Sequence, residues 1–216
     1  MNDKIISLEN LQAILFDFDG VLAECMNVKT EAFTELYQPY GKDVVAKVVD
    51  HHITNGGISR YVKFRYYHEN FLNQKITDEE VNDLAQQFSD LVVKKVIKSP
   101  WVSGSKDLLD RNYEKIDMYV ISGTPQIELR KIVKERNMDH YFKGVYGSPD
   151  TKPVISHRII SKYNYNSKKV VYIGDSYSDY ENAIEVNIPF IGRLLPGKSS
   201  PFPKDIPLIS DFTELM

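Results

Sequence analysis

Two carboxylates follow a short apolar run near the start of the chain. Ala13–Phe16 are all apolar, and Asp17, Phe18, Asp19 and Gly20 come directly after them. In an extended segment alternate side chains point to the same side, so Asp17 and Asp19 share one side and Phe18 points away. Two like charges held so close repel each other unless a cation or a shared proton intervenes. The pair therefore predicts a metal site, a carboxyl group of perturbed pKa, or both.

Three further apolar runs have the length of a strand and end in glycine or in polar residues. These runs, with the residues that follow them, are Met118–Ile121 before Ser122-Gly123-Thr124, Val170–Ile173 before Gly174-Asp175, and Ile188–Ile191 before Gly192. Helical patterns follow several of the runs, including Gln126–Arg136 and a short helix opened by a capping box over Ser178–Glu181. Strands that alternate with helices predict an α/β fold with a mostly parallel sheet covered on both faces. Such sheets place their sites at the carboxyl ends of the strands.

The segment between Cys25 and Lys98 lacks this alternation and carries no strand pattern. Thr77–Glu80 has the residues of a capping box, and the apolar residues after it recur at helical spacing as far as Val96. Val28–Tyr40 and Ile58–Phe71 also have helical patterns. We therefore expect an all-helical insertion between the first strand and the rest of the sheet.

Composition excludes several classes of protein. The chain has 216 residues and a net charge of -3, and no clustered basic stretch indicates a nucleic-acid partner. No apolar run is long enough to cross a bilayer, and the first residues lack the apolar core of a signal peptide. The single cysteine, Cys25, excludes an internal disulfide framework and a cysteine-based zinc site. We expect a cytoplasmic protein with neither nucleic acid nor membrane as partner.

Four short motifs occur in the order typical of the haloacid dehalogenase superfamily, which the chain resembles. The motifs are Asp17-Phe18-Asp19-Gly20-Val21, Ile121-Ser122-Gly123-Thr124, Lys152-Pro153, and Gly174-Asp175-Ser176 with Asp179. They span nearly the whole chain apart from the helical insertion, which sits where that family carries its cap domain. The resemblance implies a Rossmann-like catalytic core of residues 1–24 and 99–216 and a helical cap domain of residues 25–98, as in phosphoglycolate phosphatases and β-phosphoglucomutases.

The expected chemistry is Mg²⁺-dependent hydrolysis of a small phosphorylated metabolite. The Asp17 carboxylate would attack phosphorus and form an aspartyl phosphate. Mg²⁺ prefers hard oxygen ligands, and Asp17, the Asp19 backbone carbonyl and Asp175 supply them, the same set that the resemblance implies. The Asp19 side chain is then free to act as a general acid and base.

Four further residues are candidates for the site. Ser122 and the Gly123 backbone N–H would hold the oxygens of the transferring phosphoryl group. Lys152 would place a positive charge on that group and on Asp17. Asp179 would hold Lys152 or a metal-bound water, or it is simply an acidic residue in the first turn of a helix.

The helical insertion offers one candidate for substrate binding. Gly56–Arg60 resembles the Gly-x-Ser-Arg segment of β-phosphoglucomutase-like caps, in which the arginine meets the non-reacting part of the substrate. Arg60 would clamp a carboxylate or a second phosphate. The alternative is an ordinary helix start with Ser59 as its N-cap, and the two interpretations have equal weight.

Two alternatives to a phosphatase remain open. A phosphomutase of the β-phosphoglucomutase type would share the first half-reaction, but Glu24-Cys25 and Lys29 replace the residues that mutases usually carry after the first motif. The second alternative is a non-catalytic phosphate-binding or partner-binding module, which would need a broken motif. Dehalogenation is disfavoured because relatives with that activity lack the aspartate found here at Asp19.

Overall fold

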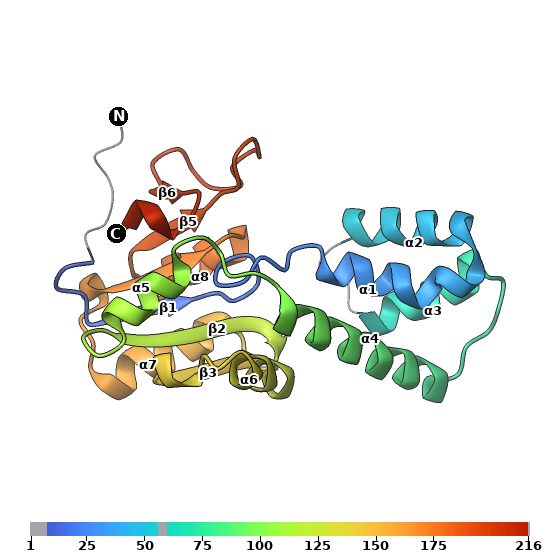
Figure 1. The fold of residues 1–216 in the computed structure, drawn as a ribbon, viewed down its shortest axis with the longest axis horizontal. Helices are drawn as coiled ribbons and strands as arrows, with labels where there is room; N and C mark the ends of the chain where they lie inside the picture. Colours follow the sequence, from blue (N-terminus) through green and yellow to red (C-terminus); the bar gives the residue numbers. More distant parts are fainter. Residues whose placement is uncertain (1–7, 56–59, 216) are drawn as a thin grey trace. The chain divides into compact units, whose positions relative to one another are not determined.

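The computed structural model describes residues 8–55 and 60–215. The chain divides into two compact units (Figure 1). The first comprises Met1–Cys25 and Ser99–Met216, and the second comprises Met26–Lys98.

A six-stranded sheet forms the centre of the first unit. Its strands are β1 (Ala13–Phe16), β2 (Asp117–Pro125), β3 (Gly144–Ser148), β4 (Val170–Gly174), β5 (Phe190–Arg193) and β6 (Leu208–Ile209). They lie in the order β3-β2-β1-β4-β5-β6, and every neighbouring pair is parallel. The predicted α/β class and parallel sheet are confirmed. Because β1 lies between β2 and β4, the residues after β1 emerge beside the carboxyl ends of both neighbours.

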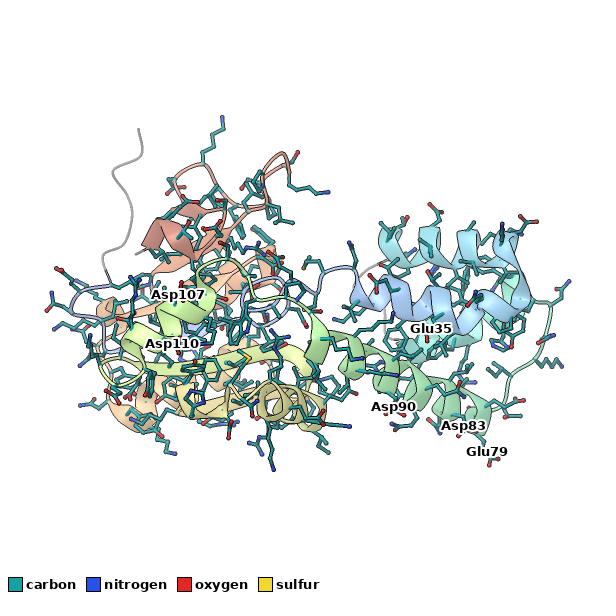
Figure 2. All side chains as sticks on the ribbon, viewed as in Figure 1. Glu35, Glu79, Asp83, Asp90, Asp107 and Asp110 are labelled. Atoms are coloured by element: carbon teal, nitrogen blue, oxygen red, sulfur yellow. The ribbon has the colours of Figure 1, made fainter. Side chains whose placement is uncertain are left out.

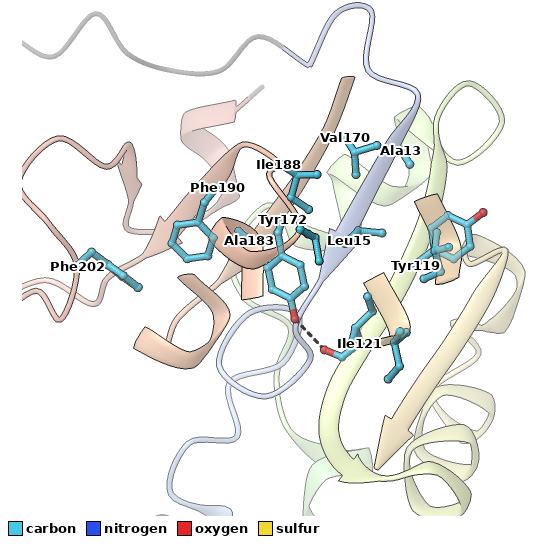
Figure 3. Close-up of a cluster of buried hydrophobic side chains, with 13 residues drawn as sticks. Ala13, Leu15, Tyr119, Ile121, Val170, Tyr172, Ala183, Ile188, Phe190 and Phe202 are labelled. Atoms are coloured by element: carbon cyan, nitrogen blue, oxygen red, sulfur yellow. Dashed lines mark hydrogen bonds between the residues drawn. The ribbon is translucent and has the colours of Figure 1, made fainter. Parts of the chain in front are cut away.

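Helices cover both faces of this sheet. They are α5 (Ser105–Asn112), α6 (Gln126–Glu135), α7 (Lys152–Tyr163) and α8 (Tyr177–Glu185), with short 3-10 helices at Asp139–Tyr141, Ser167–Lys169 and Phe212–Leu215. On one face, Leu15 and its neighbours on β2 and β4 form a buried cluster with residues of α7 and α8 (Figure 3). Phe16 belongs to the other face, where its ring centroid lies 6.4 Å from that of Phe142 and 6.2 Å from that of Phe212. Burial on both faces explains why these strands are continuous apolar runs.

Several sequence predictions for the first unit need correction. The second predicted strand does not end at Ile121 but continues to Pro125, and the predicted strand Ile188–Ile191 instead spans Phe190–Arg193. The capping box predicted over Ser178–Glu181 is formed two residues earlier, by Ser176 and Asp179. Strands β3 and β6 and helices α5 and α7 were not predicted.

Four helices make up the second unit, and its described residues include no strand. They are α1 (Val28–Tyr37), α2 (Lys42–Thr54), α3 (Arg60–Phe71) and α4 (Asp78–Lys98), with a 3-10 turn at Gln38–Tyr40. The capping box predicted before α4 is present, since the Thr77 N–H donates to Glu80 Oε2 (2.8 Å) and the Glu80 N–H donates to Thr77 Oγ1 (3.2 Å). Helix α2 was not predicted.

Aromatic side chains form the interior of the helical unit. The ring of Phe33 on α1 lies 4.5 Å from that of Phe88 and 5.7 Å from those of Phe64 and Tyr67, measured between centroids. The exposed face of α4 is polar, with Glu79, Asp83 and Asp90 along its first part (Figure 2) and Lys94 and Lys98 near its end. This polarity gives α4 the two-sided pattern of a surface helix. Among the described residues, no helix has the length and apolar character needed to cross a membrane.

A buried arginine in the first unit fixes the loop that follows β1. Arg193, at the end of β5, donates from NH1 to the Gly20 carbonyl (2.7 Å) and from Nε to the Ser210 carbonyl (3.0 Å). Its guanidinium also pairs with both carboxylate oxygens of Glu24, at 2.5 Å and 3.2 Å. Arg193 is buried whereas Glu24 is exposed to water on one side. One guanidinium therefore holds both the start and the end of the loop over Gly20–Glu24.

Replacing this arginine tests how much the loop depends on it. We expect Arg193→Met to lower the free energy of unfolding by about 2–3 kcal/mol, because the buried Gly20 carbonyl and the partly buried Ser210 carbonyl lose a charged donor. The loss stays below that of a fully buried ion pair because water reaches Glu24. Urea unfolding measures the change, and Arg193→Lys, which keeps the charge but not the fork of donors, should lose less. A change for Arg193→Met below about 0.5 kcal/mol, the usual range for surface substitutions, would contradict this role.

Candidate active site

The charged candidates of the first unit lie at the carboxyl ends of neighbouring strands. Asp17 directly follows β1, and its N–H continues the ladder by donating to the Ile173 carbonyl of β4 at 2.9 Å. Asp175 directly follows β4, and Lys152 is the first residue of α7. Residues far apart in the chain therefore reach one edge of the sheet, as expected for an open α/β fold.

Lys152 joins two of the carboxylates. Its ammonium group donates to Asp17 Oδ1 at 2.8 Å and to Asp179 Oδ1 at 2.5 Å. The second oxygen of Asp179 accepts the Ser176 N–H at 3.1 Å, which closes the capping box of α8. Asp179 thus contacts Lys152 and also occupies the first turn of a helix, and its role in holding Lys152 or a metal-bound water stays a prediction.

Close packing around Asp179 requires a glycine in the strand before it. A Cβ at Gly174 would lie 2.3 Å from the Asp179 Cβ and 2.5 Å from its Cγ. The absence of a side chain at the end of β4 therefore allows Asp179 to pack against the strand and reach Lys152.

Three carboxylates share this edge with one ammonium group. Ligand oxygens of Asp17, Asp175 and Asp179 all lie within 4.8 Å of one another. Burial raises the pKa of Asp17; Lys152 opposes this rise, and the neighbouring carboxylates add to it. Burial, followed by the Asp179 charge, raises the pKa of Asp175 to about 6. Burial opposes the charge on Lys152, but Asp17 and Asp179 outweigh it and raise the pKa of the ammonium group.

The composition of this cluster fits Mg²⁺. When all are ionised, three carboxylates and one ammonium leave two negative charges, which a divalent cation neutralises. Carboxylate oxygens are also the hard ligands that Mg²⁺ prefers. Asp17 and Asp175, both expected as ligands, lie in the cluster, and Asp179 is its third member. The role of the Asp19 backbone carbonyl as a ligand stays a prediction.

Asp19 lies outside the carboxylate cluster and has two side-chain partners of its own. The Thr124 hydroxyl donates to Asp19 Oδ2 at 3.0 Å, and the Cys25 thiol donates to Oδ1 at 3.0 Å. Burial and the Asp19 carboxylate raise the pKa of Cys25, so that the thiol keeps its proton. Neither Thr124 nor Cys25 was predicted from the sequence to have a role at the site. Two signals for Thr124 were present in the sequence: it stands in the motif Ile121–Thr124, and alternation along β2 places it on the same side as Ser122.

Ser122 and Gly123 lie on the last part of β2, where the register with β3 is irregular. Ser122 is buried, and its hydroxyl oxygen accepts the Thr124 N–H at 3.1 Å. Gly123 is exposed, with open space where a Cβ would stand. Both residues belong to the strand beside Asp17, and their binding of phosphoryl oxygens stays a prediction.

Arg60 belongs to the helical unit, at the start of α3. Its guanidinium donates to Ser89 Oγ at 2.5 Å and lies 4.9 Å from the centroid of the Phe88 ring. The other four residues of the predicted Gly56–Arg60 segment lie outside the described residues. Substrate binding by Arg60 stays a prediction, and it would have to be compatible with these contacts to α4.

The two histidines of α2 have partners within the helical unit. Buried Lys63 donates to His52 Nδ1 at 2.9 Å, and burial followed by the Lys63 charge lowers the pKa of His52 to about 4. His51 stacks on Tyr66, with 4.4 Å between ring centroids. Both rings therefore belong to the packing of the helical unit.

The fold and the motifs identify a family. A model of the haloacid dehalogenase-like hydrolases matches residues 14–193, and the chain belongs to that family. The resemblance noted from the four motifs is thereby confirmed. No curated protein matches the chain at a significant level.

Solved structures with the same fold include two hydrolases and a phosphomutase. A putative hydrolase, YfnB from Bacillus subtilis bound to magnesium, is similar with a TM-score of 0.73 and 16% identity, over 96% of this chain and 97% of that one. A predicted phosphoglycolate phosphatase from Haemophilus somnus is similar with a TM-score of 0.72 and 16% identity, over 95% of this chain and 96% of that one. A putative β-phosphoglucomutase from Thermotoga maritima is similar with a TM-score of 0.71 and 18% identity, over 92% of this chain and 94% of that one. At these identities the likeness concerns the fold.

The charge of the cluster predicts that Mg²⁺ and protons compete for it. Since the Asp175 pKa is raised to about 6, its carboxyl keeps a proton at a higher pH than in the unfolded chain, and a cation must displace that proton. We expect the affinity for Mg²⁺ to rise at least tenfold, roughly, from pH 5 to pH 8. Titration calorimetry in buffers of different ionisation enthalpy measures both affinity and proton release.

The matched control is Asp175→Asn, which keeps the shape of the side chain and removes one charge. It should bind Mg²⁺ weakly at every pH. Affinity that is independent of pH in the unmodified protein, without proton release, would contradict the cluster as the cation site.

Proposed function

We propose that this protein is a Mg²⁺-dependent phosphatase that hydrolyses small phosphomonoesters through a covalent intermediate on Asp17. The observation that carries the proposal is the ion pair of Lys152 with Asp17, inside a group of three carboxylates at the carboxyl edge of the sheet. An isolated buried carboxylate would take up a proton and lose its nucleophilicity. The Lys152 ammonium and a divalent cation together keep Asp17 ionised and let a phosphate dianion approach it.

The first half-reaction transfers the phosphoryl group to Asp17. A carboxylate oxygen of Asp17 attacks phosphorus, the bond to the leaving oxygen breaks, and that oxygen takes a proton from Asp19. Asp17 and Asp175 would hold Mg²⁺, which would neutralise negative charge as the phosphoryl group approaches the nucleophile. Ser122 and the Gly123 N–H hold phosphoryl oxygens, and Lys152 adds a positive charge beside Asp17.

The second half-reaction returns Asp17 to its starting state. Asp19, now a carboxylate, takes a proton from water, and the water oxygen attacks phosphorus. The bond between phosphorus and Asp17 then breaks and releases inorganic phosphate. Asp19 therefore works as an acid in one step and as a base in the other, which explains the need for a second carboxylate two residues after the nucleophile.

Residues that differ from the mutase pattern support hydrolysis over phosphoryl return to a sugar. Glu24 pairs with Arg193 and Cys25 donates to Asp19, so both positions have roles inside the first unit. A phosphate-release assay with Mg²⁺ over sugar phosphates, phosphoglycolate and nucleotides tests the proposal. Free phosphate supports the phosphatase, whereas an isomeric sugar phosphate as the main product would make the protein a mutase.

Asp17→Asn should abolish turnover and leave the fold intact, because the amide has nearly the same shape but is a poor nucleophile. We expect kcat to fall by more than roughly 10³-fold. Circular dichroism and thermal melting provide the control for folding. A variant that keeps a tenth of the original turnover would rule out an obligatory covalent intermediate.

Asp19→Asn should lower kcat by roughly 10²–10⁴-fold for substrates with poor leaving groups, since a general acid and base is lost. The loss in the first half-reaction should shrink for p-nitrophenyl phosphate, because its leaving group needs no protonation. A pre-steady-state burst of p-nitrophenol separates this step from the second one. An equally slow first step for good and poor leaving groups would argue against the acid role.

A further inference from the structure

Each carboxylate oxygen of Asp19 accepts a hydrogen bond from a different side chain. Thr124 lies on β2 and donates to Oδ2, whereas Cys25 lies after the loop that follows β1 and donates to Oδ1, both at 3.0 Å. An ionised carboxylate only accepts, so the hydroxyl and the thiol are the donors. The proposed acid and base is therefore held from two sides, by residues of the same structural unit.

The two donors differ in strength and in freedom. Thr124 is buried and β-branched, so its side chain is rigid, and a hydroxyl bound to a carboxylate forms a strong charge-assisted bond. A thiol is a weak donor. The Cys25 sulfur also lies 3.4 Å from the Ala23 carbonyl, which offers its hydrogen a second acceptor. The thiol hydrogen can therefore turn to the Ala23 carbonyl when Oδ1 changes its partner, whereas the Thr124 hydroxyl has no second acceptor among the described residues.

We propose that Thr124 is a positioning residue that anchors Asp19 through Oδ2, and that Oδ1 is the oxygen that exchanges protons with the leaving group and with water. This assignment rests on the phosphatase function proposed above. In the first half-reaction the proton on Oδ1 passes to the leaving oxygen as that oxygen takes the electron pair of its bond to phosphorus. The Cys25 thiol then donates to the free Oδ1. In the second half-reaction Oδ1 takes a proton from water, and the thiol turns back to the Ala23 carbonyl.

The assignment predicts that a serine hydroxyl has opposite effects on activity at the two positions. At Thr124 the hydroxyl is needed, so Thr124→Ser should resemble the unmodified enzyme and Thr124→Val, of the same shape, should not. At Cys25 a stronger donor competes with the substrate for Oδ1, so Cys25→Ser should be slower than Cys25→Ala. A purely structural role of the thiol would place the serine variant nearer to the unmodified enzyme.

Steady-state kinetics with phenyl phosphate and p-nitrophenyl phosphate test these effects, since only phenyl phosphate has a leaving group that needs a proton. We expect Thr124→Val to lower kcat for phenyl phosphate by about 10–100-fold, with little change in KM and a smaller loss for p-nitrophenyl phosphate. The kcat of Thr124→Ser for phenyl phosphate should stay within about threefold of that of the unmodified enzyme. Cys25→Ser should lower kcat for phenyl phosphate by about 3–10-fold, and Cys25→Ala should lower it by no more than about twofold. Unchanged Thr124→Val activity, equal losses for both substrates, or a faster Cys25→Ser than Cys25→Ala would overturn the assignment.

A spectroscopic measurement separates this proposal from the phosphatase function. The chain has one cysteine, so its infrared S–H stretching band reports Cys25 alone. We expect the band to move to higher frequency in Asp19→Asn, because an amide oxygen is a weaker acceptor than a carboxylate. A band that does not move would refute the thiol contact even if phosphate is released. A band that moves in a protein without Asp17-dependent phosphate release would refute the proposed function, and with it the proton-transfer role of Oδ1.

Discussion

The ammonium group of Lys152 is the interaction on which the rest of the site depends. It contacts Asp17 and Asp179 in a place where three carboxylates lie within 4.8 Å of one another. This positive charge opposes the burial and mutual repulsion that raise the pKa of Asp17 and Asp175. The surrounding structure serves to bring the groups together. Parallel strands deliver Asp17 and Asp175 to one edge, the first turn of α7 delivers Lys152, and Gly174 leaves room for Asp179.

The same arrangement separates two carboxylates that are close in sequence. Asp17 faces the cluster and Lys152, whereas Asp19 has Thr124 and Cys25 as partners. Two residues of the same type therefore have different electrostatic surroundings, which suits one of them to attack phosphorus and the other to exchange protons. Arg193 contributes by holding the carbonyl of Gly20 and the carboxylate of Glu24, the two ends of the loop after Asp19.

Local sequence patterns predicted the elements whose signal lies within a few residues. The apolar run before Asp17 matches β1 at both ends, because a strand buried on both faces has to be apolar throughout. The capping box of α8 was assigned two residues too late, since Ser176 with Asp179 and Ser178 with Glu181 fit the pattern equally well. Only the end of β4 at Gly174 decides between them. Strand β3 contains two glycines in five residues, and its pairing with β2 is what makes it a strand.

Contacts between distant segments could not be predicted in the same way. The bond from Thr124 to Asp19 joins residues 105 positions apart, and the pair of Arg193 with Glu24 joins residues 169 positions apart. Such contacts follow from the order of strands in the sheet, which no local pattern contains. The motifs of the family identified Asp17, Lys152 and Asp175 as candidates, but the partners that hold Asp19 required the folded chain.

Trapping of the covalent intermediate tests the central claim most directly. In Asp19→Asn the second half-reaction lacks its base, whereas p-nitrophenyl phosphate can still transfer its phosphoryl group without an acid. Acid quenching after mixing, followed by mass spectrometry of peptides, should therefore find one phosphoryl group on the peptide with Asp17, and none when Asp17 is also replaced by Asn. Release of p-nitrophenol at the enzyme concentration or above without a phosphorylated Asp17 peptide, or with the phosphoryl group on another residue, would contradict Asp17 as the nucleophile.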